Sequence, residues 1–125
     1  MIVWDAYLAN LLKFMVQGGH DMIYLMIRHK VRPGKQKEIN EACAESVRLW
    51  QKHGCKVLGA WNNWIGGETD EIMYIYQFKD FAEYQEIDVK VHNDPDWPNF
   101  IRMVGDGSIG RTTELLRPTS YSPLQ

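Results

Sequence analysis

Strand-like and helix-like segments alternate in this chain in an order that few folds accommodate. Residues 22–31, MIYLMIRHKV, are mostly aliphatic and end before Pro33-Gly34, a pair typical of turns. Beyond Lys35 the spacing changes, and the side chains expected on one face recur three and four positions apart: Ile39, Cys43, Ser46, Val47 and Trp50. This pattern predicts a helix of about five turns that Gly54 ends.

The middle of the chain indicates a β-hairpin followed by a second helix. Residues 55–65 and 71–78 are short, aromatic runs, and the glycine-containing sequence GGETD lies between them. After Asp80, a residue suited to cap a helix, apolar side chains again follow a helical spacing through Phe81, Tyr84, Ile87 and Val91. We therefore expect a hairpin and then a helix that begins at residue 81.

The sequence NDPDWPNF, residues 93–100, predicts the start of a further helical segment. Asp94 suits the N-cap position, and Pro95 suits the first helical position, where its missing N–H costs nothing. Side chains expected to face the protein in this helix are Trp97, Ile101 and Val104. The helix should end within residues 105–107, and residues 108–117 should form the last strand.

These segments together predict an α+β fold with the order β-α-β-β-α-β. That order describes a ferredoxin-like sandwich, in which helices cover one face of a four-stranded antiparallel sheet. The other face has no helix over it, and because these strands are rich in aromatic side chains we expect it to be covered rather than left in water. We therefore expect two copies to pair through their sheets as a homodimer, a dimeric α+β barrel.

Composition narrows the class of protein. At 125 residues, the chain is long enough for one core, and its hydrophobic and charged fractions of 45% and 24% are ordinary for a globular domain. The net charge is −2 with no basic stripe, which argues against nucleic acid as a partner. Cys43 and Cys55 lack the spacing of a metal or redox motif, and we interpret them as reduced packing thiols of a cytoplasmic protein.

Residues 1–21 are expected to form a separate extension before the main domain of residues 22–125. They have no basic amino-terminal region, as a secretory signal would, and Asp5 and Lys13 interrupt a stretch too short to cross a membrane. Apolar residues from Trp4 to Met15 recur at helical spacing, and Gly18-Gly19 follows them. The pattern predicts an extra amino-terminal helix, with no role for the membrane as a partner.

Several strand residues are candidates for chemistry or binding. His29 lies in the first strand among apolar side chains, where an imidazole could act as a general base or could be a buried structural residue. Tyr74 and Tyr76 share one face of the third strand, and Trp61 and Asn63 share one face of the second. Aromatic rings with polar tips suit a small-molecule pocket, and they suit a subunit interface equally well.

Metal, nucleotide and nucleophile sites are not indicated. The four histidines show none of the spacings of a zinc site, and GGETD is too short to cradle a phosphate and precedes a strand. No cofactor is therefore expected. Asp94 and Asp96 could be imagined as paired catalytic carboxylates, although helix capping explains both more simply.

Four stretches, in their order and spacing, resemble the NIPSNAP family. They are MIYLMIRHKVRPGK, GAWNNWIGGETDEIMYIYQF, NDPDWPNF and TELLRPTSYSPL, which together span Met22 to about Leu124. The resemblance implies a dimeric α+β barrel of ferredoxin-like topology. Related barrels include cofactor-free monooxygenases and isomerases, but a shared fold is weak evidence for a shared activity.

The chain departs from the pattern of this family where polar side chains would otherwise stand. In the first strand, the family pattern has an acid, an arginine and a tyrosine where this chain has Leu25, Ile27 and His29. In the second strand, it has an acid where this chain has Trp64. In the third strand, it has a histidine and a tryptophan where this chain has Tyr74 and Tyr76. If these positions face a cavity, that cavity is more apolar than is usual for the family.

We therefore expect a homodimer that binds a small hydrophobic or aromatic molecule in a barrel cavity. Two alternatives remain open. One is a cofactor-independent enzyme, monooxygenase-like or isomerase-like, that uses His29 as its base. The other is a non-catalytic interaction or scaffold protein whose cavity is filled by its own side chains.

Overall fold

The computed structural model describes residues 22–68 and 70–125. The helix predicted for residues 1–21, and with it the domain boundary at residue 22, lies outside the described residues. The elements are β1 (Ile23–Val31), α2 (Gln36–Lys52), β2 (Lys56–Asn62), β3 (Glu71–Phe78), α3 (Phe81–His92), α4 (Trp97–Gly107) and β4 (Ser108–Leu116). No helix in this part of the chain is long and apolar enough to cross a bilayer.

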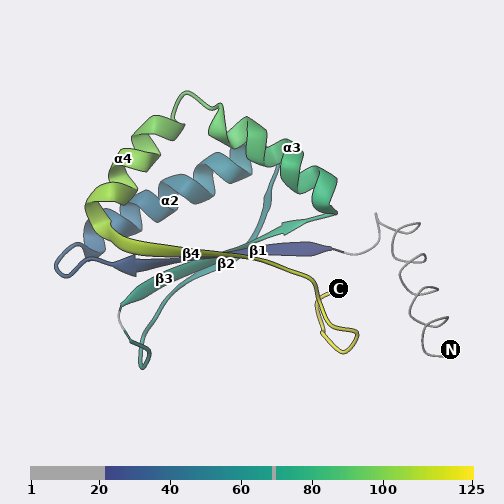
Figure 1. The fold of residues 1–125 in the computed structure, drawn as a ribbon, viewed down its shortest axis with the longest axis horizontal. Coiled ribbons are helices and arrows are strands. Elements are labelled where there is room, and N and C mark those ends of the chain that lie inside the picture. The colour runs from purple at the N-terminus through teal and green to yellow at the C-terminus, as the bar shows by residue number, and fades with distance from the viewer. Residues whose placement is uncertain (1–21, 69) are drawn as a thin grey trace, which may run out of the picture.

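The four strands form one antiparallel sheet in the order β2-β3-β1-β4. The two strands in the middle, β1 and β3, pair with Ile27 opposite Tyr74, and β1 pairs with the edge strand β4 with His29 opposite Arg111. Figure 1 shows α2, α3 and α4 on the same side of this sheet. The ferredoxin-like α+β prediction is confirmed.

Alternation along the two central strands explains why the helices cover only one face. In β1 and β3 every second side chain is buried, including Leu25, Ile27, Tyr74 and Tyr76, whereas most of those between them are partly exposed. Helix α2 presents its own buried stripe to the same face, with Trp50 stacked on Tyr76 at 5.1 Å between ring centroids. The core therefore lies between the sheet and the helices.

Two predictions about the last helix are wrong. Helix α4 begins at Trp97, with Asp96 rather than Asp94 at the N-cap and Pro98 in the first turn. Its buried aromatic side chain is Phe100, whereas Ile101, which was expected to face the protein, is exposed. From Trp97 the side chains that face the core lie three and then four residues on, at Phe100 and Val104. The prediction placed the four-residue step first and so missed Phe100.

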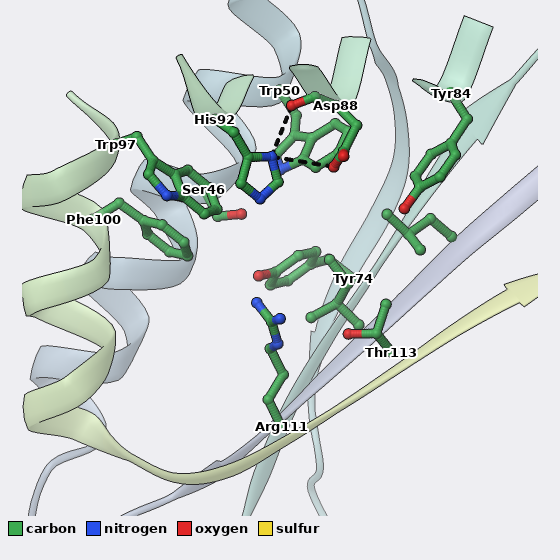
Figure 2. Close-up of a pocket in the computed structure, with 12 residues that line it drawn as sticks. Ser46, Trp50, Tyr74, Tyr84, Asp88, His92, Trp97, Phe100, Arg111 and Thr113 are labelled. Atoms are coloured by element: carbon green, nitrogen blue, oxygen red, sulfur yellow. Dashed lines mark hydrogen bonds and ion pairs between the residues drawn. The ribbon is translucent and has the colours of Figure 1, made fainter. Parts of the chain in front are cut away.

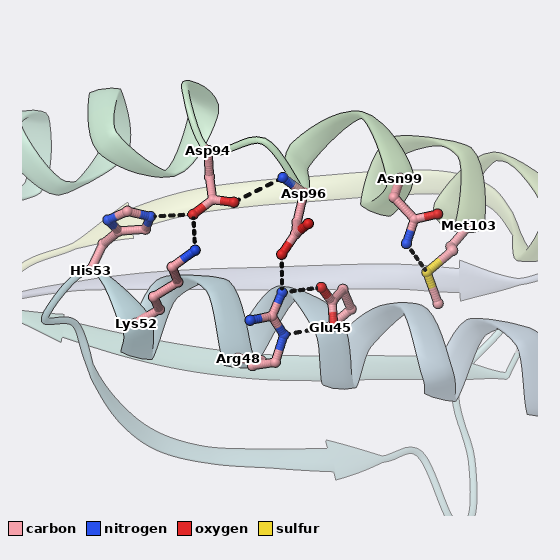
Figure 3. A network of polar contacts seen from close by, with 8 residues as sticks. All are labelled: Glu45, Arg48, Lys52, His53, Asp94, Asp96, Asn99 and Met103. Atoms are coloured by element: carbon pink, nitrogen blue, oxygen red, sulfur yellow. Dashed lines mark hydrogen bonds and ion pairs between the residues drawn. The ribbon is translucent and has the colours of Figure 1, made fainter.

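Asp94 instead ties helix α2 to the segment that leads into α4 (Figure 3). Its carboxylate accepts a hydrogen bond from the backbone N–H of Asp96, and it pairs with Lys52 Nζ at 2.8 Å and His53 Nε2 at 2.7 Å. The side chain is only 1% exposed, and these donors, Lys52 first, hold the pKa of Asp94 well below its usual range. The carboxylate therefore has a structural role.

The sheet face away from the helices carries a mixed surface. Met26, Met73 and Ile75 lie there between the buried positions of their strands, and Arg28 pairs with Glu71 at 3.6 Å. At one end the carboxyl-terminal tail folds against this face, where the Tyr24 hydroxyl donates to the backbone oxygen of Gln125 at 3.0 Å (Figure 1). None of the described helices covers the rest.

The close packing of α4 on α2 can be tested by substituting two glycines of α4, one at the contact and one away from it. A Cβ added at Gly107 would lie 3.0 Å from the Cβ and backbone nitrogen of Ile39, whereas one at Gly105 would meet nothing within 4 Å. We expect Gly107→Ala to lower the free energy of unfolding by about 1–3 kcal/mol through overpacking. Gly105→Ala should raise it by up to about 1 kcal/mol through helix propensity. Urea denaturation measures both, and equal effects of the two variants would contradict this packing.

Candidate functional site

A pocket of about 230 Å³ lies between the sheet and the helices (Figure 2). Its apolar wall consists of aromatic rings from five positions on α2, β3, α3 and α4: Trp50, Tyr74, Tyr84, Trp97 and Phe100. Leu25 and Ile27 of β1 add aliphatic surface. A cavity of this size is below the range of about 300–1,000 Å³ that holds drug-sized ligands, so it suits a molecule of one or two rings.

Helix α4 contributes to this wall because its amphipathic turn packs on the end of α3. The rings of Trp97 and His92 lie 4.2 Å apart, and those of Trp97 and Phe100 lie 5.0 Å apart. His92 is held in turn by Asp88, whose backbone oxygen lies 2.7 Å from its Nδ1. His92, Trp97 and Phe100 thus form a continuous set of packed rings, with the carboxylate of Asp88 beside it.

The remaining polar groups come from α2 and from the edge strand β4. Ser46 lies at the inner end of the pocket, and Arg111 and Thr113 line it from β4. Figure 2 shows the Arg111 side chain extending from β4 toward the hydroxyl of Tyr74. Since β4 is an edge strand with most of its side chains exposed, Arg111 lies at the open side of the pocket.

His29 lies behind Tyr74 and reaches the pocket only through it. The imidazole is 0% exposed, and its Nε2 lies 2.9 Å from the Tyr74 hydroxyl. Its Nδ1 has no hydrogen-bond partner among the described residues. Burial, and then the charge of Arg111, lower the pKa of His29 from 6.5 to about 4. At neutral pH the pocket is therefore backed by an uncharged imidazole.

The two tyrosines of β3 occupy different depths. Tyr74 lines the pocket, whereas Tyr76 lies between Ser46, whose hydroxyl is 3.1 Å from its own, and the stacked ring of Trp50. Burial raises the pKa of both phenols well above the usual value, while the charge of Arg111 acts on Tyr74 in the opposite direction. Both hydroxyls stay protonated, so Tyr74 offers the pocket a neutral hydrogen-bonding group.

The predicted ligand-binding residues do not form one site. Tyr74 lines the pocket, and Tyr76 is buried beside it. Trp61 is 50% exposed at the outer edge strand β2, where it borders a separate hollow of about 340 Å³ with α2. Asn63 follows β2 in the loop, where its side chain donates to the backbone oxygen of Gly66. Trp64, also in that loop, is 90% exposed.

The prediction of a chamber lined by these strand aromatics between two facing sheets is wrong for the β3 tyrosines. Tyr74 and Tyr76 point toward the helices, so a pocket that contains them lies within one protomer. The physical reason is the alternation of the strand. Residues 72, 74, 76 and 78 share the face that α2 covers.

Sequence reasoning missed Arg111, Trp97 and Phe100 as pocket residues. The signal for Arg111 was its place in the last strand, since the strand order of this fold puts β4 beside β1 and His29 opposite Arg111. A helical spacing from Trp97 allows either Phe100 or Ile101 to face the protein. The packing of α4 on α2 selects Phe100, which is buried.

The two thiols do not line this pocket. Cys43 and Cys55 are buried and unpaired, and burial raises the pKa of each thiol to about 12, so neither is a ready nucleophile. Within residues 22–68 and 70–125, no cluster of three His, Cys, Asp or Glu side chains could hold a metal ion.

Residues 24–123 match the NIPSNAP family over most of the chain. The chain belongs to the NIPSNAP family. Protein NipSnap homolog 2 of Mus musculus is 23% identical over 103 residues, which are 79% of this chain and 36% of that protein. This NIPSNAP chain thus corresponds to about a third of the length of its mouse relative.

Solved structures share the fold. A NIPSNAP family protein of unknown function from Agrobacterium tumefaciens is 21% identical, with a TM-score of 0.74 over 85% of this chain and 96% of that one. SnoaB, a cofactor-independent oxygenase from Streptomyces nogalater, is 10% identical, with a TM-score of 0.60 over 82% of this chain and 98% of that one. At these identities the likeness concerns the fold alone.

The burial of His29 predicts how stability depends on pH. Because the folded-state pKa of His29 is lowered to about 4 from 6.5, the unfolded chain binds the proton more readily between these values. Its contribution to stability is complete above pH 6.5 and falls by about 2–3 kcal/mol as the pH drops to 4. Urea denaturation across this range measures the slope, and imidazole NMR signals give the midpoint.

A His29→Leu, Tyr74→Phe double variant is the control for this prediction, because it removes the imidazole without leaving the tyrosine hydroxyl unpaired. Its stability should depend less on pH between 4 and 6.5. A His29 titration midpoint near 6.5 in the folded protein would contradict the prediction.

Proposed function

We propose that this NIPSNAP protein binds a small hydrophobic or aromatic molecule in the pocket between its sheet and its helices. The observation that carries the proposal is the pocket of about 230 Å³, whose wall contains five aromatic residues. Aromatic rings provide a large apolar surface, and flat ligands stack on them in offset or edge-to-face geometry. The ligand would lie within each protomer.

The Tyr74 hydroxyl gives such a ligand a point of orientation. It lies on the pocket wall and is backed by the neutral imidazole of His29 at 2.9 Å. Because this contact already holds the hydroxyl in place, the hydroxyl loses little conformational entropy when it forms a hydrogen bond to a ligand. The scaffold alternative, in which side chains fill the cavity, is less well supported because the pocket retains volume and opens beside β4.

A second candidate function is cofactor-independent catalysis. Two observations favour it: the His29–Tyr74 pair at the pocket wall, and the fold shared with SnoaB, a cofactor-independent oxygenase. In that role His29 would not touch the substrate, because Tyr74 lies between them. It would be a positioning residue that accepts or returns a proton through the tyrosine hydroxyl.

We also propose that the protein is a homodimer joined through the open sheet face. Met26, Met73 and Ile75 present apolar surface there, and the Arg28–Glu71 pair can remain hydrated at its edge. Trp61 pairs with Met73 in the strand register, and its ring lies over Gly59. Tyr76 has no place in this interface, because it is buried under α2.

The pocket is tested with 2-naphthol, a neutral two-ring probe. It should shift the indole N–H signals of Trp50 and Trp97 in NMR spectra of the full chain. Thr113→Trp, which fills the pocket from an exposed strand position, should weaken binding at least tenfold. Ile101→Trp on the exposed side of α4 is the control and should bind like wild type. Shifts that are the same in the Thr113→Trp protein would exclude this pocket.

Native mass spectrometry of freshly purified protein tests the dimer and reports any retained small molecule in the same spectrum. Trp61→Glu should shift the population toward monomer, because it places a charge on the apolar face. Trp64→Glu alters the same residue type in the β2–β3 loop and should leave the dimer intact. A wild-type protein that is wholly monomeric would refute the proposal.

A further inference from the structure

Arg111 is a cation at the pocket that lacks a counterion in the described part of the chain. Ion pairs among these residues engage Arg28, Arg48, Lys52 and other cations, but none of them includes Arg111. The register of β1 and β4 places Arg111 directly opposite His29, on the face that points to the helices. Its guanidinium therefore extends into the space where a ligand would lie (Figure 2).

The charge of Arg111 acts on groups in the wall of this space and directly behind it. It lowers the pKa of His29 and opposes the effect of burial on the pKa of Tyr74 and Tyr84. A positive charge that reaches three groups around one cavity favours a negative group placed among them. The Tyr74 hydroxyl, toward which the guanidinium extends, can donate its one proton to the same group when His29 Nε2–H donates to the hydroxyl oxygen.

The opposite wall limits where the negative group can lie. Asp88 lines the pocket from α3, with His92 Nδ1 3.3 Å from its carboxylate oxygen. A second anionic group near Asp88 would be repelled, whereas an uncharged ring fits between the aromatic side chains there. The pocket is thus polarised, with a cation at the β4 side and a carboxylate at the α3 side.

We propose that the ligand is a small aromatic carboxylic acid, bound with its carboxylate on Arg111 and Tyr74 and with its ring among Trp50, Trp97 and Phe100. The planar guanidinium matches a carboxylate with two parallel hydrogen bonds, a geometry that an amide or an alcohol does not reproduce. This inference rests on the proposed function, since it names the ligand class of the same pocket.

The test compares 2-naphthoate with 2-naphthamide, which has the same rings and no charge. Titration of the full-length protein, followed by calorimetry and by the NMR signals of Trp50 and Trp97, gives both dissociation constants. In the wild type, 2-naphthoate should bind roughly 10- to 100-fold more tightly than the amide. Arg111→Gln should remove this advantage, so that the two compounds bind with similar affinity.

Arg102→Gln is the control for the loss of one positive charge. Arg102 is exposed on α4 outside the pocket, where its nearest partner is Asn99, so this variant should retain the preference for 2-naphthoate. The comparison between the two ligands in wild-type protein needs no variant, and so does not depend on whether Arg111→Gln folds.

The outcomes separate the two proposals. If both compounds bind in the pocket with equal affinity and Arg111→Gln changes neither, the carboxylate inference is overturned and the pocket proposal stands. If neither compound nor 2-naphthol shifts the signals of Trp50 and Trp97, both proposals are overturned. A preference for 2-naphthoate that persists in Arg111→Gln would also overturn the role of Arg111.

Discussion

The packing of helix α2 on the centre of the sheet is the contact on which the rest of the structure depends. Trp50 stacks on Tyr76, and Ser46 meets the hydroxyl of the same tyrosine, so one helix face fixes the central strand through an aromatic and a polar contact together. With α2 in place, the alternation of β3 directs Tyr74 to the same side. The pocket wall therefore follows from the contact that forms the core.

Burial under the helices also sets the chemistry of the site. His29 is uncharged at neutral pH because the cost of burying a charged imidazole outweighs what its single contact with Tyr74 can offset. Arg111, on an edge strand that the helices leave exposed, remains hydrated and charged. A neutral pair at the back and a cation at the mouth thus arise from the depth of each strand position.

Much of the fold could be predicted from local patterns. Each strand and helix of the described chain lies close to the residues expected for it. Side chains that share a face recur every two residues in a strand and every three to four residues in a helix, so the sequence pattern distinguishes the two. The start of α4 was the exception. Asp94 has the sequence signature of a helix cap, but its carboxylate pairs with Lys52 and His53 at the end of α2. A local sequence pattern cannot reveal a contact with a different element.

By itself, the sequence determined the elements, their order, the family and the faces on which His29, Tyr74 and Tyr76 lie. Only the tertiary structure decided which of the two sheet faces the helices cover, and therefore that the tyrosines belong to a pocket inside one protomer. It also placed Arg111 and Phe100 at that pocket, 82 and 71 positions after His29 in the chain. The reason is physical. Periodicity acts between neighbours in sequence, whereas a pocket forms where separate elements pack, and its charge depends on how deeply each side chain is buried.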